Sequence, residues 1–415
     1  MSSNGHEARR HEAVGGGEGS RGAAPSASGE STALISRLRA RFRPDIIRWR
    51  AHHALTHRTS IRIPFWRGVL PTGGRSHRRV LILSHDSAIC QSQIYPFYFY
   101  RRQLGLRYGA EIREYDVNAF LHRSGGRLDE ADVVVVQPWF TLGDEGLARL
   151  LEAVRRRCRP QRIVFLDSYA PTDLRFAKTL AGQVNVYVKK HVLADRAQYG
   201  RPTRGDTGLM DFYGRRYGLD FPQVTFEVPP ALLDALVIGP SFATADYMLA
   251  AFKNDLPPRG PRNLDVHARM ARDGTDWYRS LRSESLDALR AIRGITTASG
   301  TGVARSEFLR ELARARLCFS PFGYGEVAWR DYEAVMCGSL LLKPDMSHVQ
   351  TDPDIFVAEE TYVPVRWDLA DLETKVRYYL AHEDERLRIA GNAHRVLRDY
   401  FRRERFVDQM APLFR

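Results

Sequence analysis

Cysteine is scarce in this sequence of 415 residues. The four cysteines, Cys90, Cys158, Cys318 and Cys337, form no CxxC pair and no Cys/His spacing of the kind that binds a metal. Neither a disulfide framework nor a structural zinc site is therefore indicated. We expect four reduced thiols in the core and no bound metal.

Long apolar runs are missing as well. No stretch approaches the ~18 uninterrupted apolar residues that a membrane-spanning helix needs, and the first residues contain no apolar signal core. These absences predict a cytoplasmic protein. Residues 1–33 have almost no large apolar side chains, so they cannot bury enough surface to offset the entropy of ordering, and we expect a disordered tail.

Basic side chains outnumber acidic ones. The sequence holds 62 Lys and Arg against 49 Asp and Glu, which gives a net charge of +13, carried mostly by arginine. Such a balance favours phosphate-bearing small molecules, nucleic acid or an anionic membrane surface. The arginines are spread along the whole chain with no helix-turn-helix, RRM or OB pattern, so we expect no nucleic-acid partner.

Residues 34–76 form a basic extension after the tail. Residues 34–58 mix Leu, Ile, Phe and Trp with many arginines, and Pro44 interrupts any single helix. One interpretation is a segment that lies on anionic lipid, with its Trp and Ile inserted, and makes peripheral contact with the inner face of the membrane. The other is a pair of basic helices packed against the folded body.

An alternation of strands and helices begins near residue 79. Short apolar runs at 80–83, 133–136 and 163–166 predict buried strands, with helical patterns at 95–106 and 144–158 between them. Alternating elements of this kind predict a parallel sheet covered on both faces. We assign 77–235 to a Rossmann-like domain in which the irregular residues 189–218 form loops.

A second alternation follows the Pro-rich breaker at 254–263. Its predicted strands are 264–270, 293–300, 317–321 and 339–344, and its predicted helices are 283–292, 306–316, 326–337, 370–379 and 383–401. We assign residues 236–392 to a second Rossmann-like domain, with residues 393–415 as a closing helix that packs back on the first. The fold class is thus α/β, with two Rossmann-like domains facing across a cleft.

The stretch FSPFGYGEVAWRDYEAVMCG at 319–338 places a glycine loop before a helix. On a helix from Glu326 to Cys337, the side chains of Glu326, Arg330 and Glu333 fall within roughly 60° of one another. Gly323 and Gly325 allow close backbone approach, and the free N–H groups at the helix start favour a diphosphate.

Two interpretations fit these charges. Arg330 can contact phosphate oxygens and Glu333 can accept hydrogen bonds from ribose hydroxyls, or the three residues form a surface ion-pair ladder.

The order of the pieces GEVAWRDYEAVMCGSLLL, DIFVAEETYVPV and DLADLETKVRYYLAHEDERLRIAGNAHRVL resembles the C-terminal half of GT-B glycosyltransferases. The resemblance spans about residues 315–401, and spore-maturation-type and exostosin-like transferases are the group it is most similar to. It implies a nucleotide-sugar donor held by the C-terminal domain, an acceptor on the N-terminal domain, and no metal or other cofactor.

Glu333 matches the glutamate that binds the donor ribose in that family. Many retaining members carry an earlier glutamate eight residues before it; Gly325 stands there in this chain, and Glu326 is seven residues before Glu333. The resemblance therefore implies a catalytic role for Glu326, although its spacing to Glu333 differs by one residue from that of the family.

Other candidates lie at predicted strand ends. Arg269 and Arg282 are candidates to neutralise the donor diphosphate, or are ordinary surface arginines. His85 and Asp86 follow the first strand, and either side chain is a candidate general base that takes the proton of the acceptor hydroxyl. Alternatively, Asp86 only caps the turn that follows the strand. Asp167 is a further base candidate, with the same alternative. Lys343 and Asp345 either line the donor-sugar pocket or are solvated loop charges, and the second is expected.

Together these patterns predict a metal-independent glycosyltransferase. It would move a sugar from a nucleotide-sugar donor to a hydroxyl of a glycan, a lipid-linked intermediate or a cell-surface polymer precursor. The alternative is a non-catalytic GT-B-like protein that binds nucleotide or glycan and takes part in an assembly.

Overall fold

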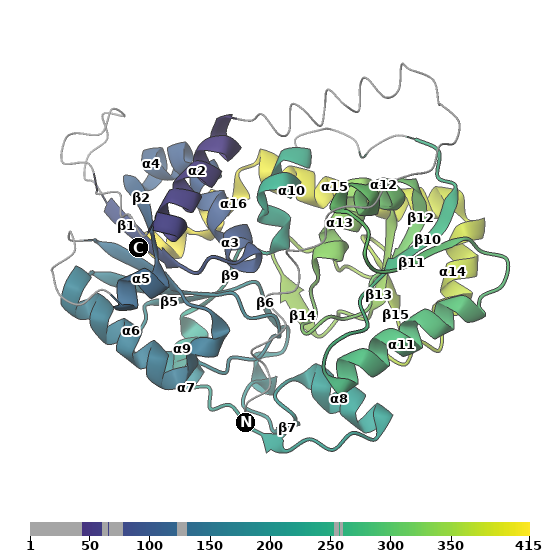
Figure 1. The fold of residues 1–415 in the computed structure, drawn as a ribbon, viewed down its shortest axis with the longest axis horizontal. Helices are drawn as coiled ribbons and strands as arrows, with labels where there is room; N and C mark the ends of the chain where they lie inside the picture. Colours follow the sequence, from purple (N-terminus) through teal and green to yellow (C-terminus); the bar gives the residue numbers. More distant parts are fainter. Residues whose placement is uncertain (1–43, 60–64, 66–77, 123–130, 253–256, 258–259) are drawn as a thin grey trace.

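The computed structural model describes residues 44–59, 65, 78–122, 131–252, 257 and 260–415. These residues form two α/β domains, each built on one parallel sheet (Figure 1). The predicted fold class is confirmed. The tail 1–33 and much of the basic extension lie outside the described residues.

The N-terminal domain has a six-stranded sheet in the order β2-β1-β3-β4-β5-β9, and every neighbouring pair is parallel. Its strands are β1 (Arg78–Ser84), β2 (Ala110–Asp116), β3 (Val133–Gln137), β4 (Arg162–Asp167), β5 (Val186–Lys189) and β9 (Leu236–Ile238). Its helices are α2 (Pro44–Thr59), α3 (Ala88–Phe99), α4 (Arg101–Tyr108), α5 (Val117–His122), α6 (Gly143–Cys158), α7 (Ala177–Leu180), α9 (Pro230–Asp234) and α10 (Asp246–Ala251). The same part of the chain contains α8 (Gly208–Tyr217), which packs against the C-terminal domain (Figure 1). A short antiparallel pair, β7 (Thr203–Arg204) and β8 (Gln223–Val224), lies before and after α8.

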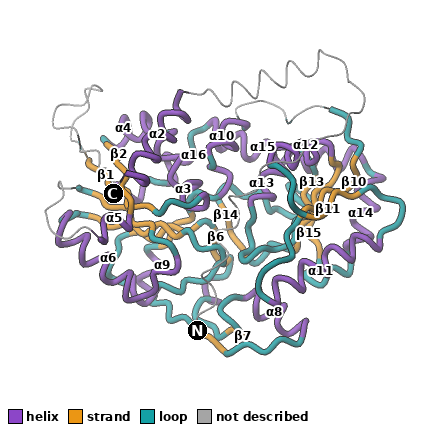
Figure 2. The backbone as a smooth tube through the Cα atoms, in the orientation of Figure 1, coloured by secondary structure: helices purple, strands orange, loops and turns teal. Residues whose placement is uncertain are grey.

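The C-terminal domain has a five-stranded parallel sheet in the order β11-β10-β12-β13-β15. Its strands are β10 (Leu264–Arg269), β11 (Thr297–Gly300), β12 (Ala315–Phe319), β13 (Leu340–Pro344) and β15 (Val363–Val365). Its helices are α11 (Asp276–Ala291), α12 (Arg305–Arg314), α13 (Trp329–Cys337), α14 (Leu372–Ala381), α15 (Glu383–Arg402) and α16 (Arg405–Gln409). Figure 2 shows the strands of the two sheets as separate groups on opposite sides of the molecule.

Two further strands join the domains. β6 (His191–Leu193) follows the N-terminal sheet strand β5 and pairs antiparallel with β14 (Val349–Thr351) of the C-terminal domain. Residues 189–218, which the sequence analysis placed in loops, therefore contain an interdomain strand and helix α8. The error has a physical cause, since β6 is short and acquires its hydrogen-bond partner only from the other domain.

The end of the chain also crosses between domains. α15 begins on the C-terminal domain, and its last turn and the following α16 contact the N-terminal one. Tyr100 donates to the carbonyl of Phe401 in α15 at 3.2 Å, and the rings of Phe97 and Phe406 lie 5.1 Å apart. One apolar cluster contains side chains of both domains, including Val135 and Phe322.

Several local predictions need correction. The helix expected over residues 95–106 is two helices, α3 and α4, that meet at Tyr100. In α2, Ile46 and Trp49 are buried, so these apolar side chains pack on the protein body and are not available for lipid. Among the described residues no helix is both long and apolar enough to span a bilayer. The four cysteines are buried free thiols, as predicted.

Candidate active site

Helix α13 begins at Trp329, three residues later than expected. The carboxylate of Asp331 fixes this start, because it accepts from the backbone N–H of Ala328 at 2.8 Å and from the hydroxyl of Ser320 at 2.6 Å. Ala328 is extended, with φ −122° and ψ 157°. Glu326 therefore lies in the preceding loop, and the predicted charged edge of Glu326, Arg330 and Glu333 on one helix does not exist.

Glu326 instead connects the two domains. Its carboxylate accepts from the hydroxyl of Thr172 at 2.9 Å, from the Thr172 backbone N–H at 3.2 Å, and lies 3.2 Å from Nε2 of His191. The residue is only 2% exposed. Burial opposes its ionisation, but the hydrogen bond and charge of His191 lower the pKa of Glu326 to about 2. Its charge is thus held in place by N-terminal groups and does not face open solvent.

Both glycines of the loop lie close to other atoms of the protein. A Cβ on Gly325 would lie 2.1 Å from the carbonyl oxygen of Ala170, so the loop touches N-terminal backbone there. The N–H of Gly323 donates to the carbonyl of Gly325 at 3.1 Å, and a Cβ on Gly323 would lie 3.7 Å from Nη2 of Arg282. Gly325 therefore belongs to the domain contact, and Gly323 lies beside a cation.

Three cations gather behind this loop. Arg282 is 5% exposed, and its guanidinium lies over the ring of Tyr278 at 4.7 Å. Lys343 is fully buried, with Nζ 3.1 Å from Asp331. Burial lowers the pKa of Lys343, and it lowers the pKa of Arg282 to about 10. Arg330 adds to both effects through its positive charge.

These cations are incompletely compensated. Within the described part of the chain, the buried Nε atoms of Arg282 and Arg330 have no hydrogen-bond partner. Arg330 uses Nη2 to donate to the carbonyl of Arg269. Asp331 is the carboxylate paired with Lys343, so the charges of the two arginines are not balanced by it. An anion bound nearby would reduce the repulsion among the three cations.

Glu333 is buried on α13, near the same cluster. Tyr247 donates its hydroxyl to the Glu333 carboxylate at 2.9 Å, and a guanidinium nitrogen of Arg305 lies 3.7 Å away. Burial raises the pKa of Glu333, and the positive charges of Arg305 and Arg330 partly offset that rise. The carboxylate does not point to bulk solvent, as a surface ion-pair ladder would require.

Arg269 is already neutralised. Its guanidinium binds both oxygens of Glu311, at 2.5 and 2.7 Å, and the carbonyl of Ser299 at 2.8 Å. The prediction of a diphosphate ligand at this position gains no support from these contacts, because the charge has a forked partner within the domain. Lys343, expected to be solvated, is the buried cation of the site.

His85 and Asp86 follow β1 in the N-terminal domain. The His85 ring stacks on Trp139 with centroids 5.0 Å apart, and burial lowers the pKa of His85. Asp86 is half exposed and accepts from the Gln91 amide at 2.8 Å. His53 approaches the same oxygen at 3.1 Å. The contacts of these two candidates are with other N-terminal residues.

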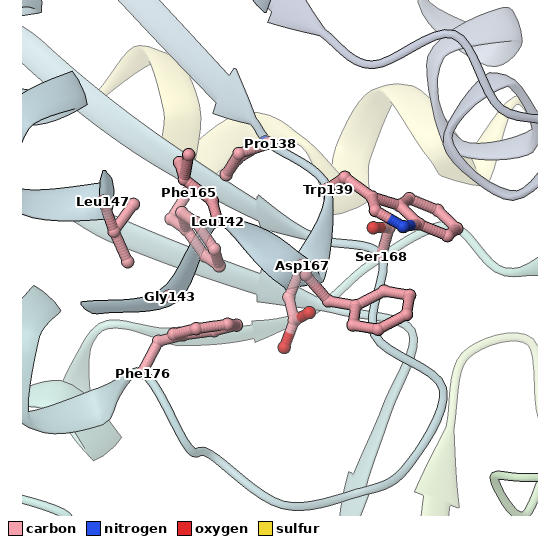
Figure 3. Close-up of a pocket in the computed structure, with 10 residues that line it drawn as sticks. Pro138, Trp139, Leu142, Gly143, Leu147, Phe165, Asp167, Ser168 and Phe176 are labelled. Carbon is pink, nitrogen blue, oxygen red and sulfur yellow. The ribbon is translucent and has the colours of Figure 1, made fainter. Parts of the chain in front are cut away.

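A small apolar hollow lies near them, at the carboxyl ends of β3 and β4. Figure 3 shows Trp139 and Phe176 on its two sides, with Asp167 and Ser168 at its rim. Asp167 is not a free base, because Nζ of Lys189 and the hydroxyl of Tyr187 both bind it at 2.6 Å.

Sequence reasoning misjudged part of the site and missed another part. Lys343 was a candidate, but it was expected to be solvated; its position at the end of the apolar run SLLLKP, after three buried leucines, was a signal of burial. Thr172 and His191 offered no signal, because their contacts to Glu326 depend on how the domains meet.

Residues 273–411 match the family model described as glycosyl transferase-like. The match contains the stretch on which the sequence resemblance rests, so that resemblance is confirmed. Comparison with curated proteins gave no match.

Among solved structures, an α-glucosyltransferase in complex with UDP and DNA is similar at 9% identity, with coverage of 82% of this chain and 100% of that one and a TM-score of 0.47. Sucrose-phosphate synthase from Thermosynechococcus elongatus is similar at 12% identity, with coverage of 81% and 98% and a TM-score of 0.45. TarM is similar at 8% identity and a TM-score of 0.41; the alignment covers 68% of this chain and about half, 54%, of TarM.

One prediction about partners is corrected by this comparison. The even spread of arginines and the lack of a familiar motif led us to exclude nucleic acid. A similar structure is nevertheless that of an enzyme in complex with DNA. The missing motifs therefore do not exclude nucleic acid as a partner.

Proposed function

We propose that this chain, which carries a glycosyl transferase-like domain at residues 273–411, transfers a sugar from a nucleotide-sugar donor to a hydroxyl of a glycan, a lipid-linked intermediate or a cell-surface polymer precursor. The observation that carries the proposal is the cluster of the buried Arg282 and Lys343 with the partly buried Arg330 in that domain; its three positive charges exceed the single charge of its ion-paired carboxylate, Asp331.

The donor diphosphate is assigned to Arg282 and Arg330. Both keep an unpaired Nε among the described residues, and guanidinium groups bind phosphate oxygens in a forked geometry. A departing nucleoside diphosphate gains negative charge, so fixed cations stabilise the transition state more than the ground state. Because side chains supply this charge, we propose that the diphosphate needs no metal ion.

Glu333 is assigned to the donor ribose. Its carboxylate is held by Tyr247, and two adjacent hydroxyls of a ribose could bind the remaining acceptor sites of the two oxygens. Glu326 is proposed as a positioning residue, because its oxygens are bound to Thr172 and His191.

His85 is proposed as the base for an inverting transfer. Burial lowers the pKa of this imidazole, so it is neutral at pH 7 and able to accept the proton of an acceptor hydroxyl. It lies at the carboxyl edge of the N-terminal sheet, where ligands bind in open α/β folds. The negative charges of Asp116 and Asp86 partly offset this lowering of the His85 pKa.

A titration with nucleoside diphosphates tests the donor assignment. We expect calorimetry to show binding of at least one of UDP, GDP, ADP, CDP or TDP to the wild-type protein, and a loss of about tenfold or more in Arg282→Met, Arg330→Met and Glu333→Gln, as for a lost charged hydrogen bond. The matched control is Arg377→Met, an exposed arginine paired with Glu373, which should bind as the wild type does.

If none of the five diphosphates binds, or if the three variants and the control behave alike, the assignment is wrong. Turnover separates an enzyme from a binding protein. Release of nucleoside diphosphate from the matching nucleotide sugar, abolished in His85→Gln with binding retained, supports transfer. Binding without release of nucleoside diphosphate in the presence of glycan acceptors supports the non-catalytic alternative.

A further inference from the structure

A cluster outside the donor site brings two imidazoles to one carboxylate. His53 and His57 are four residues apart on α2, so they share a face of that helix. This face lies against β2, which carries the fully buried Glu114. Nδ1 of His53 is 3.0 Å from Oε1 of Glu114, and Nε2 of His57 is 3.1 Å from the same oxygen.

The opposite nitrogen of each ring has a carboxylate partner of its own. Nδ1 of His57 lies 2.7 Å from Asp116, and Nε2 of His53 lies 3.1 Å from Asp86 and 2.9 Å from the amide nitrogen of Gln91. When an N–H donates to that outer carboxylate, the inner nitrogen of the same ring presents a lone pair. A histidine that binds a metal through one nitrogen and donates to a carboxylate through the other has the same arrangement.

Three atoms that can bind a metal ion converge here, from a single helix and a single strand. The possible ligand atoms of His53, His57 and Glu114 all lie within 4.8 Å of one another. Metal bonds of about 2.1 Å in a tetrahedral site place neighbouring ligand atoms roughly 3.4 Å apart. The observed separations of 3.0 and 3.1 Å are a few tenths of an ångström shorter, so small side-chain movements would admit an ion.

We propose that His53, His57 and Glu114 bind a divalent transition-metal ion, with Zn²⁺ as the ion best matched to two imidazoles and one carboxylate. Asp86 and Asp116 orient the two rings, and the hydroxyl oxygen of Ser84, 3.2 Å from Nε2 of His57, borders the site. The ion ties α2 to the carboxyl ends of β1 and β2. It is separate from the donor diphosphate site, which lies in the other domain.

Charge supports this assignment. Glu114 and the two orienting carboxylates bring three negative charges to the cluster; the side chains of Glu114 and His57 are 0% and 1% exposed, whereas that of Asp86 is 52% exposed. A divalent ion with neutral histidines offsets most of that charge. This site could not be predicted from sequence, because Glu114 is separated from His57 by 57 positions and no Cys/His spacing marks it.

The full-length protein, stripped with a chelator and then titrated with Zn²⁺ or Co²⁺, tests the proposal. We expect stoichiometric binding, a Zn²⁺-dependent rise in the thermal midpoint, and visible ligand-field absorption with Co²⁺. His53→Gln and His57→Gln should abolish all three signals. Asp116→Asn keeps every ligand and should weaken binding by about 10–100-fold, the usual effect of losing an orienting partner.

The matched control is His52→Gln on the same helix. His52 contacts the hydroxyl of Tyr98 at 3.0 Å and is not one of the converging ligands, so the variant should bind Zn²⁺ as the wild type does. If the wild type gives no Co²⁺ spectrum and no Zn²⁺ shift, or if His52→Gln loses as much as His57→Gln, the cluster is a metal-free network of imidazolium and carboxylate groups. If the ligand variants fail to fold, the Asp116→Asn variant still tests the proposal. An unchanged Zn²⁺ affinity in that variant would be enough to overturn it.

Discussion

The carboxylate of Glu326 lies 3.2 Å from Nε2 of His191, and this contact joins a loop of the C-terminal domain to an interdomain strand of the N-terminal side. Both side chains are almost completely buried. Thr172 supplies two further donors to the same carboxylate. The glycine loop is therefore held against the other domain at the position where a catalytic glutamate was expected from sequence.

Glu326→Ala should destabilise the interdomain contact. The change leaves the donors of Thr172 and His191 buried without an acceptor, and each unsatisfied buried group costs about 1–3 kcal/mol. We expect a lower unfolding midpoint in urea and faster proteolysis of the folded protein. Glu360→Gln, on an exposed residue, is the control. An unchanged midpoint in Glu326→Ala would show that the contact is dispensable.

Gly325→Ala should disturb the same contact by a different route. The added methyl group would lie 2.1 Å from the carbonyl oxygen of Ala170, a backbone atom that cannot rotate away. Overpacking of this kind costs about 1–3 kcal/mol, and sometimes more. We expect a lower thermal midpoint and weaker nucleotide binding.

Gly391→Ala provides the comparison for that experiment. Gly391 lies within α15 and a Cβ there would meet no atom within 4 Å. Alanine in a helix interior is favoured over glycine by about 0.5–1 kcal/mol, so the midpoint should rise slightly. If both alanine variants shift the midpoint in the same direction, crowding at Ala170 is not the cause.

Lys343→Met should destabilise the C-terminal domain. Nζ of Lys343 lies 3.1 Å from Asp331 and both side chains are fully buried. Breaking a buried pair by removing one partner costs about 3–5 kcal/mol, because the other charge is left uncompensated. Asp331 would keep its bonds from Ser320 and Ala328, which places the expected loss at the lower end. The double variant Lys343→Met/Asp331→Asn should recover part of that stability in urea unfolding.

The fold was predictable where burial follows a simple pattern. The apolar runs of β1, β3, β4 and β13 are nearly all buried, and each was expected as a strand. β2 was not, because its sequence AEIREYD contains three acidic residues and an arginine. Its charges are accommodated by partners from elsewhere, such as the two histidines of α2 at Glu114, and a local pattern cannot contain that information.

The candidate site also contains features that a local sequence pattern predicts and features that it does not. Glu333 and Arg282 were expected near a ligand, and the structure buries both beside other charges. The extent of the helix after the glycine loop was predicted wrongly, since the cap formed by Asp331 shortens it. Glu326 could not be placed from sequence, because its partners come from β6 and a loop more than 130 residues earlier.

The buried Lys190 should make stability depend on pH. Burial, aided by the charge of Lys189, lowers the pKa of Lys190 to about 7, whereas a lysine in an unfolded chain titrates near 10.4. Between these values the unfolded chain binds more protons than the folded one, so this residue makes the free energy of unfolding rise as pH increases from about 7 to 10. The free-energy cost of burying the charged lysine is complete below pH 7. There the folded protein buries the ammonium group with the carbonyl of Ser168, 2.9 Å away, as its hydrogen-bond acceptor.

Lys190→Met should therefore be more stable than the wild type by a larger margin at pH 6 than at pH 9, measured by urea unfolding at both values. An equal margin at the two pH values would mean that Lys190 does not titrate in this range.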